Sequence, residues 1–167
     1  KEKLTSIDSS DKISFKKSAI IVFLAVVVTI IIFYLLTYII YDVLGSSANS
    51  AAAIYIRDMY MRNKFIYVIF TFFTVTFEEV VYRKLLFGYL YDLHSGCNRY
   101  IRLITSLLGS VIIFGAIHDG VLGSGMIYYV IAGISFTIVY FYTKRISAAI
   151  AIHFLYNICV PLIRTII

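Results

Sequence analysis

The amino-acid sequence predicts an all-α protein, a polytopic transmembrane helical bundle with about five spans. Of its 167 residues, 61% are hydrophobic and only 14% are charged, whereas charged residues make up about a quarter of an ordinary soluble domain. The mean hydropathy is +0.91. Five apolar runs approach the roughly 20 residues that a membrane-spanning helix needs; they are Ser18 to Tyr41, Phe65 to about Tyr91, Ile101 to His118, Met126 to Thr143 and Ile146 to about Ile163. Because the bilayer satisfies no backbone polar group, we expect these runs to be helices that bury their polar side chains against one another.

The chain divides into three parts along its length. Residues 1–17 are polar and charged and are expected to form a cytoplasmic segment. Residues 18–64 hold the first transmembrane helix and a loop, in which Gly45-Ser46-Ser47 breaks the apolar run and Ala51 to Met61 is expected to form an interfacial amphipathic helix. Residues 65–167 hold the other four apolar runs.

The basic residues indicate an orientation in the membrane. The net charge is +6, but Lys and Arg lie between apolar runs and not in a soluble basic domain, which argues against a nucleic-acid partner. With a cytoplasmic N-terminus, nine basic residues fall inside and four outside, as the positive-inside rule prefers. The inner residues are Lys1, Lys3, Lys12, Lys16, Lys17, Arg99, Arg102, Lys144 and Arg145, and the outer ones are Arg57, Arg62, Lys64 and Arg164.

The second apolar run contains two adjacent carboxylates, Glu78 and Glu79, followed by Arg83. On a helix Glu79 and Arg83 share a face, while Glu78 points about 100° away. A Glu79–Arg83 pair that only neutralises charge explains those two residues but leaves Glu78 without a partner. Unpaired intramembrane carboxylates usually mark a functional site, so we expect Glu78 to act as a general base.

Two further couplets supply neutral hydrogen-bonding groups. Phe114 and His118 are four residues apart near the end of the third run, so their rings are expected to lie on one face. His153 and Asn157 have the same spacing inside the fifth run and could donate hydrogen bonds to a developing negative charge. Each couplet alone is equally compatible with interfacial location or helix packing. Together, in three separate spans, they predict an intramembrane hydrolase.

In these three motifs, EExxxR, FxxxH and HxxxN in that order, the sequence resembles the CAAX protease and bacteriocin-processing family of intramembrane proteases, also called the Abi family. The resemblance covers roughly Phe65 to the C-terminus and implies that residues 65–167 form the family's four-helix catalytic core. Members either remove the last three residues of prenylated CAAX proteins or are tied to bacteriocin self-immunity and peptide-pheromone maturation. The resemblance implies an intramembrane endopeptidase, with a membrane-associated peptide or protein as its substrate.

The resemblance also implies roles for individual residues. Glu78 and His118 would bind and activate the attacking water, and His153 and Asn157 would form the oxyanion site. The supporting residues would be Glu79, Arg83 and Phe114. The family is often labelled metalloprotease, and Glu78, His118 and His153 could bind zinc and leave a position open for water. No HExxH motif is present, and we favour a metal-free, glutamate-activated mechanism by a small margin.

Helix counting creates one difficulty for this site. At about 1.5 Å per residue, and with parallel spans, Glu78 lies near mid-membrane, His118 at the outer end of its span and His153 in the inner third. Helix tilt, a bent second helix or a shifted boundary would bring them together.

Two other functions remain open on the sequence alone. One is a non-catalytic bacteriocin immunity protein that binds a membrane partner and keeps the polar residues for packing. The other is a proton or ion pathway through Glu78 and His118, which we favour less because it gives Arg83 and Asn157 no role. The small size and the Ile-, Tyr- and Phe-rich composition favour a bacterial plasma membrane, where a bacteriocin leader or pheromone precursor is a better candidate substrate than a prenylated protein.

Overall fold

The structure, a computed structural model, describes residues 4–43, 51–121, 123 and 125–164. Within these residues every regular element is a helix, which confirms the all-α prediction. Lys1, Lys3 and Gly45-Ser46-Ser47 lie outside the described residues, as does the side chain of Arg164. The predicted orientation of the N-terminus therefore stays a prediction.

Five helical segments are long and apolar enough to cross a membrane, as the sequence predicted. They are Phe15–Val43, Lys64–Leu93, Arg99–Asp119, Met126–Thr143 and Ile146–Ile163. Each agrees with its predicted run to within a few residues. Large apolar side chains point outward from them, among them Phe23, Phe73 and Ile117, each 67% exposed. Such an apolar outer surface suits contact with lipid.

Two of the five segments are not regular α-helices throughout. The first consists of α2 (Phe15–Tyr38) and a π-helical turn, η1 (Ile39–Val43). The second runs from α4 (Lys64–Glu79) through a π-helical stretch, η2 (Val80–Phe87), into α5 (Gly88–Leu93). The sequence patterns did not predict either π-helix. The helix α3 (Ala51–Arg62) confirms the predicted helix that precedes α4, and its interfacial location stays a prediction.

Short polar side chains set the helix boundaries. Asn63 accepts hydrogen bonds from the backbone N–H groups of Phe65 and Ile66 at the start of α4. Asn98 does the same at the start of α6 (Arg99–Asp119). These side chains satisfy N–H groups that have no partner inside the helix. At its other end α6 stops at Gly120, where φ is +76°, a conformation that glycine adopts without steric cost.

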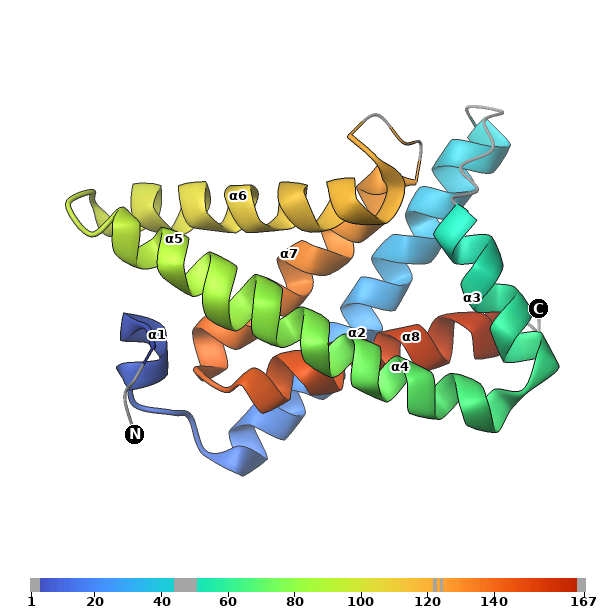
Figure 1. The fold of residues 1–167 in the computed structure, drawn as a ribbon, viewed down its shortest axis with the longest axis horizontal. Coiled ribbons are helices and arrows are strands. Elements are labelled where there is room, and N and C mark those ends of the chain that lie inside the picture. Colours follow the sequence, from blue (N-terminus) through green and yellow to red (C-terminus); the bar gives the residue numbers. More distant parts are fainter. Residues whose placement is uncertain (1–3, 44–50, 122, 124, 165–167) are drawn as a thin grey trace.

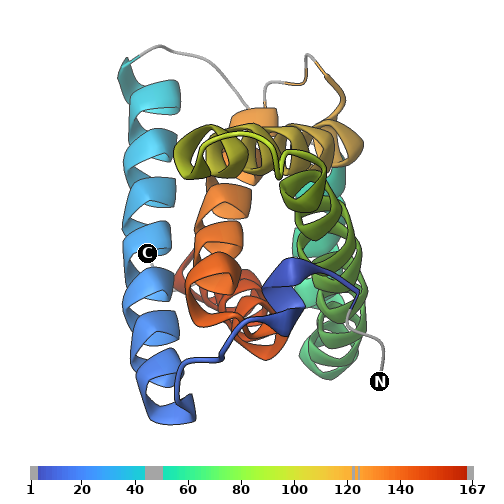
Figure 2. The same ribbon diagram turned by 90° about the vertical axis from the view of Figure 1, so that its left-hand side faces the viewer.

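The helix α7 (Met126–Thr143) lies at the centre of the molecule. It contacts α6, α2, η2 and α8 (Ile146–Arg164). Figure 2 shows α7 between α2 on one side and the α4–η2–α5 segment on the other. Its buried residues include the small Ala132 and Gly133 beside Phe136, and small residues allow neighbouring helices to approach closely. The apolar packing between α2, α7 and α8 continues through Val26, Phe136 and Ile152.

The polar segment before the first span contains a short helix, α1 (Ser6–Ser9), that packs against the bundle. Its Ile7 is 1% exposed and lies in a cluster with Phe87, Tyr140 and Ala149. The surrounding contacts are polar. Asp8 forms an ion pair with Lys84 at 3.5 Å and accepts a hydrogen bond from the Tyr140 hydroxyl at 3.2 Å, and Ser6 hydrogen-bonds to Asp92. The polar N-terminal segment is therefore held against the bundle by one buried apolar side chain and by these polar contacts.

We expect Ile7→Ala to destabilise the protein by about 2–5 kcal/mol, because it removes a fully buried side chain and leaves a cavity. Thermal unfolding of the detergent-purified protein measures this loss. Leu4→Ala is the matched control, since Leu4 is 63% exposed. Equal shifts of the unfolding midpoint in the two variants would show that α1 is not packed as described.

Candidate active site

The residues of the three motifs come from three helical segments, and two of them, His118 and His153, face the carboxylate of Glu78. Asn157 lines the same cavity. Glu78 and Glu79 end α4, Phe114 and His118 lie on α6, and His153 lies on α8. The helices are inclined to one another and not parallel (Figure 1), so residues at different fractions of their spans meet at one point. The different depths obtained by helix counting rested on the assumption of parallel spans, which the structure does not support.

Glu79 and Arg83 form a fully buried ion pair beneath the site. Arg83 Nη1 lies 2.9 Å from Glu79 Oε1, and the two side chains are 1% and 0% exposed. The guanidinium carbon lies 4.4 Å from the ring centre of Phe114 and 5.3 Å from that of Phe136. Its Nη2 donates to the backbone carbonyl of Gly133 at 3.5 Å. Two aromatic faces and a carbonyl thus supply part of what water would otherwise provide to this charge.

The absence of a side chain at Gly133 on α7 leaves space for the guanidinium group of Arg83. A Cβ atom at this position would lie 3.3 Å from Arg83 Nη2 and 3.3 Å from Phe114 Cδ1, tighter than most such contacts. The small residue therefore lets α7 approach both Arg83 and Phe114.

His153 is held by the same buried pair. Its Nδ1 lies 2.7 Å from Glu79 Oε1, so Nδ1 carries the proton and donates to that carboxylate. Its ring stacks on Phe136, with 4.4 Å between the ring centres and 23° between the planes. The opposite nitrogen, Nε2, faces Glu78 Oε2 at 3.8 Å. This arrangement fixes both the orientation and the tautomer of the imidazole.

His118 is oriented in a similar way by different partners. Its Nδ1 lies 2.7 Å from the carbonyl oxygen of Phe114, one helical turn earlier, and donates to it. The ring lies between Phe114 and Tyr129, at 4.3 and 4.7 Å between ring centres. Its Nε2 faces Glu78 Oε1 at 3.4 Å.

Glu78 therefore lies between two imidazoles, with one oxygen toward each. Its side chain is 17% exposed, while that of Glu79 is fully buried. Because Nδ1 of each histidine carries a proton, a neutral ring presents an Nε2 lone pair to a carboxylate oxygen. At separations of 3.4 and 3.8 Å, two such acceptors need a shared proton, or a water on the cavity side that donates to both.

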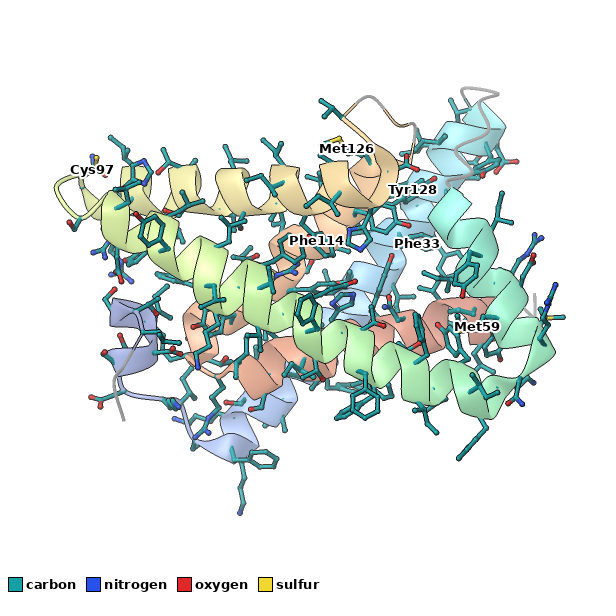
Figure 3. The ribbon with its side chains drawn as sticks, in the orientation of Figure 1. Phe33, Met59, Cys97, Phe114, Met126 and Tyr128 are labelled. Atoms are coloured by element: carbon teal, nitrogen blue, oxygen red, sulfur yellow. The ribbon has the colours of Figure 1, made fainter. Side chains whose placement is uncertain are left out.

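A cavity of about 710 Å³ opens onto this cluster. Glu78, His118, His153 and Asn157 all line it. Most of the other lining residues are apolar or aromatic, including Phe33, Tyr60, Tyr67, Phe70, Tyr128 and Tyr156. Figure 3 shows Phe33 and Tyr128 to one side of Phe114, toward α3, which carries Met59. The Tyr128 hydroxyl is buried and has no hydrogen-bond partner among the described residues.

The described residues contain no group of three or more His, Cys, Asp or Glu side chains arranged to hold a metal ion. The Nε2 atoms of the two histidines face different oxygens of Glu78, at 3.4 and 3.8 Å. The zinc ligands considered from sequence, Glu78, His118 and His153, do not fit a metal as they stand. We therefore derive the chemistry from the side chains themselves.

Several residues that shape the site were not singled out in the sequence. Tyr129 and Phe136 hold the two imidazoles, and Gly133 accommodates Arg83. The three are spaced at i, i+4 and i+7 on α7, so they lie on one helical face. That spacing was a readable signal, but aromatic and small residues are so frequent in this chain that it did not stand out. Tyr67, whose hydroxyl bonds to the backbone of Asn157, gave no signal.

Comparisons with known proteins converge on one family. Residues 60–159 match the family model described as type II CAAX prenyl endopeptidase Rce1-like. The chain is also 35% identical over 80 residues to the membrane-embedded CAAX protease MroQ of Staphylococcus aureus (strain USA300). That match covers 48% of the chain and 31% of the relative, so the chain spans about a third of the length of the curated relative that it matches. No solved structure matches the chain.

We expect Arg83→Met to destabilise the protein by about 3–5 kcal/mol, because it leaves the Glu79 carboxylate buried without its counter-charge. The double variant Glu79→Gln/Arg83→Met removes both charges and should recover much of that loss. Membrane abundance and the unfolding midpoint in detergent measure both effects.

Arg57→Met is the control for this pair. Arg57 pairs with Asp58 at 3.5 Å, but the two side chains are 66% and 50% exposed, so its removal should change stability very little. A double variant as unstable as Arg83→Met would contradict the charge-pair explanation.

Proposed function

Since the chain belongs to the Rce1-like family of type II CAAX prenyl endopeptidases, we propose that it is a CAAX-type intramembrane endopeptidase. It is an integral membrane protein. The reaction is hydrolysis of a peptide bond in a membrane-associated peptide or protein. One observation supports this proposal above the others, the position of Glu78 between the Nε2 atoms of His118 and His153 at the wall of a large apolar cavity.

In the proposed mechanism, a water molecule in the cavity contacts both Glu78 and His118, which line it. It donates one proton to Glu78 and the other to the Nε2 lone pair of His118, whose tautomer is set by the Phe114 carbonyl. Glu78 takes the first proton as the water oxygen attacks the peptide carbonyl carbon. The same proton then passes to the leaving nitrogen as the carbon–nitrogen bond breaks. Glu78 ends each cycle as a carboxylate, and the products are a free carboxyl group and a free amine.

Attack on the carbonyl creates an oxyanion that needs hydrogen-bond donors. Asn157 can donate from its side-chain amide without any change of charge. His153 can donate from Nε2 only when its ring carries both protons, and the Glu79 carboxylate at Nδ1 supplies a counter-charge for that form. We assign Glu79 and Arg83 to positioning His153, because the pair contacts the imidazole and not the cavity that holds the substrate.

The size and the lining of the cavity suit an apolar segment of a substrate. Its volume of about 710 Å³ falls in the range of ligand pockets, and its wall is largely aromatic. The unpartnered Tyr128 hydroxyl is a candidate hydrogen-bond donor to the substrate backbone. We propose a bacterial bacteriocin leader or pheromone precursor as the substrate in preference to a prenylated protein. The place of action would be the bacterial plasma membrane, with the N-terminus in the cytoplasm and residues 65–167 as the catalytic core.

We expect Glu78→Gln to abolish proteolysis while leaving the protein in the membrane at normal abundance, because glutamine has nearly the same shape but cannot accept the proton. His118→Ala and His153→Ala should lower activity by at least 100-fold, in the range typical of general acid–base groups. The measurement is a comparison of new peptide N-termini in host membranes that carry the wild type or each variant at matched abundance.

Asp11→Asn serves as the control, since it also removes one negative charge but lies in the exposed part of the N-terminal segment. Fragments that appear with the wild type and Asp11→Asn but not with Glu78→Gln establish the hydrolase. A host phenotype such as bacteriocin resistance that survives Glu78→Gln would instead establish an immunity protein that acts by binding.

Removal of metal ions is expected to leave the Glu78-dependent cleavage intact. The test is metal analysis of the purified active protein together with its activity after dialysis against a chelator. Zinc at one equivalent per chain, lost in parallel with activity and restored with it, would show that Glu78, His118 and His153 rearrange around a metal.

A further inference from the structure

The backbone carbonyl of Asn157 cannot be satisfied within its own helix in the usual way. In an α-helix this carbonyl would accept a hydrogen bond from the backbone N–H of the residue four positions later. That residue is Pro161, which lies inside α8 and has no N–H. An unpaired carbonyl is costly in the membrane interior, where no water replaces the missing donor.

Tyr67 of α4 supplies the missing donor. Its hydroxyl donates to the Asn157 carbonyl oxygen at 2.5 Å, across 90 residues of sequence. Tyr67 is 1% exposed, and its ring packs edge-on against Tyr60 of α3 with 5.3 Å between the centres. A fully buried, laterally packed ring has little freedom to move its hydroxyl away. The bond therefore ties the turn of α8 that carries Asn157 to α4, the helix that carries Glu78.

We propose that Tyr67 is a positioning residue for Asn157, acting through the carbonyl that Pro161 leaves free. This inference rests on the proposed function, in which the Asn157 amide donates to the oxyanion. Tyr67 and Glu78 lie on the same helix, so the Tyr67 hydroxyl sets the position of the oxyanion donor relative to the base. Pro161 is necessary for this role of Tyr67. A residue with a backbone N–H at position 161 would donate to the Asn157 carbonyl and make the Tyr67 hydroxyl redundant.

The bond itself can be observed without a substrate. The dipeptide Asn157-Ile158 is the single Asn-Ile pair in the sequence, so labelling Asn with ¹³C at the carbonyl and Ile with ¹⁵N gives one correlated signal from that peptide group. Tyr67→Phe should shift the Asn157 carbonyl resonance upfield, since it removes the donor. Adding Pro161→Ala to Tyr67→Phe should move it back toward the wild-type position, because the alanine N–H replaces the tyrosine hydroxyl.

The consequence for catalysis is tested with the same variants, using the Glu78-dependent fragments in host membranes as the readout. Tyr67→Phe should lower their production by about five- to tenfold, the loss expected for one hydrogen bond. Tyr67→Phe/Pro161→Ala should recover to within about twofold of Pro161→Ala alone. In an Asn157→Ala background, Tyr67→Phe should have no further effect, because nothing remains for it to position.

Tyr34→Phe is the matched control. The Tyr34 hydroxyl donates to the carbonyl of Val160 at 3.3 Å, in the same helix but past Asn157. The control should leave the Asn157 carbonyl signal and the fragment yield unchanged. If Tyr67→Phe lowers membrane abundance, the recovery by Pro161→Ala decides the matter, because a general packing defect would not be repaired by a change in another helix.

Three results would overturn the proposal while leaving the proposed function standing. These are an unshifted carbonyl signal in Tyr67→Phe, no recovery with Pro161→Ala, and a further loss of activity when Tyr67→Phe is added to Asn157→Ala. Failure of the proposed function has a different signature, since fragment production would then be independent of Glu78 in the otherwise unaltered chain.

Discussion

The arrangement of this protein depends on a buried ion pair, Glu79–Arg83, whose side chains are 0% and 1% exposed. Burial removes the hydration of both charges, so other parts of the protein must contact them. Three other helices meet the pair. Helix α8 brings His153 to Glu79, while α6 and α7 bring Phe114, Phe136 and the Gly133 carbonyl to Arg83. The pair thus links the fold to the candidate chemistry, since Glu79 and Phe136, which contact Arg83, also orient the imidazole of His153 that faces Glu78.

A division of labour between the adjacent carboxylates follows from this linkage. Glu79 is committed to Arg83 and His153, so it has no freedom to exchange protons with a substrate. Glu78 is 17% exposed at the cavity and faces the Nε2 atoms of the two histidines. The π-helical stretch η2 begins directly after Glu79, and π-helical segments, though rare, often occur at functional sites. One glutamate holds the site together and its neighbour is left free to react.

Much of the fold and the membership of the candidate site could be predicted from sequence. The spans were predictable because long apolar runs without interruption are typical of transmembrane helices. The Glu79–Arg83 ion pair was predictable because residues four apart lie on the same face of a helix. The geometry around the motif was not predictable. The chain contains 15 Tyr and 13 Phe, so nothing in the sequence distinguishes Tyr67, Tyr129 and Phe136 from the other aromatic residues. Ile7 was missed because a single apolar side chain in a polar segment carries no periodic signal. The partner of the Asn157 carbonyl lies 90 positions away, beyond the reach of local patterns.

The docking of α1 has a consequence for how the protein is made. Ile7 precedes the first span, yet the cluster that receives it is built from Phe87, Tyr140 and Ala149. The last of these residues lies in α8, which is synthesised after the other four spans described here. The complete cluster that buries Ile7 therefore cannot form until α8 has been synthesised and packed against α7. Full docking of α1 is then a late step in the assembly of these five spans, and a docked α1 marks a chain in which α8 is in place.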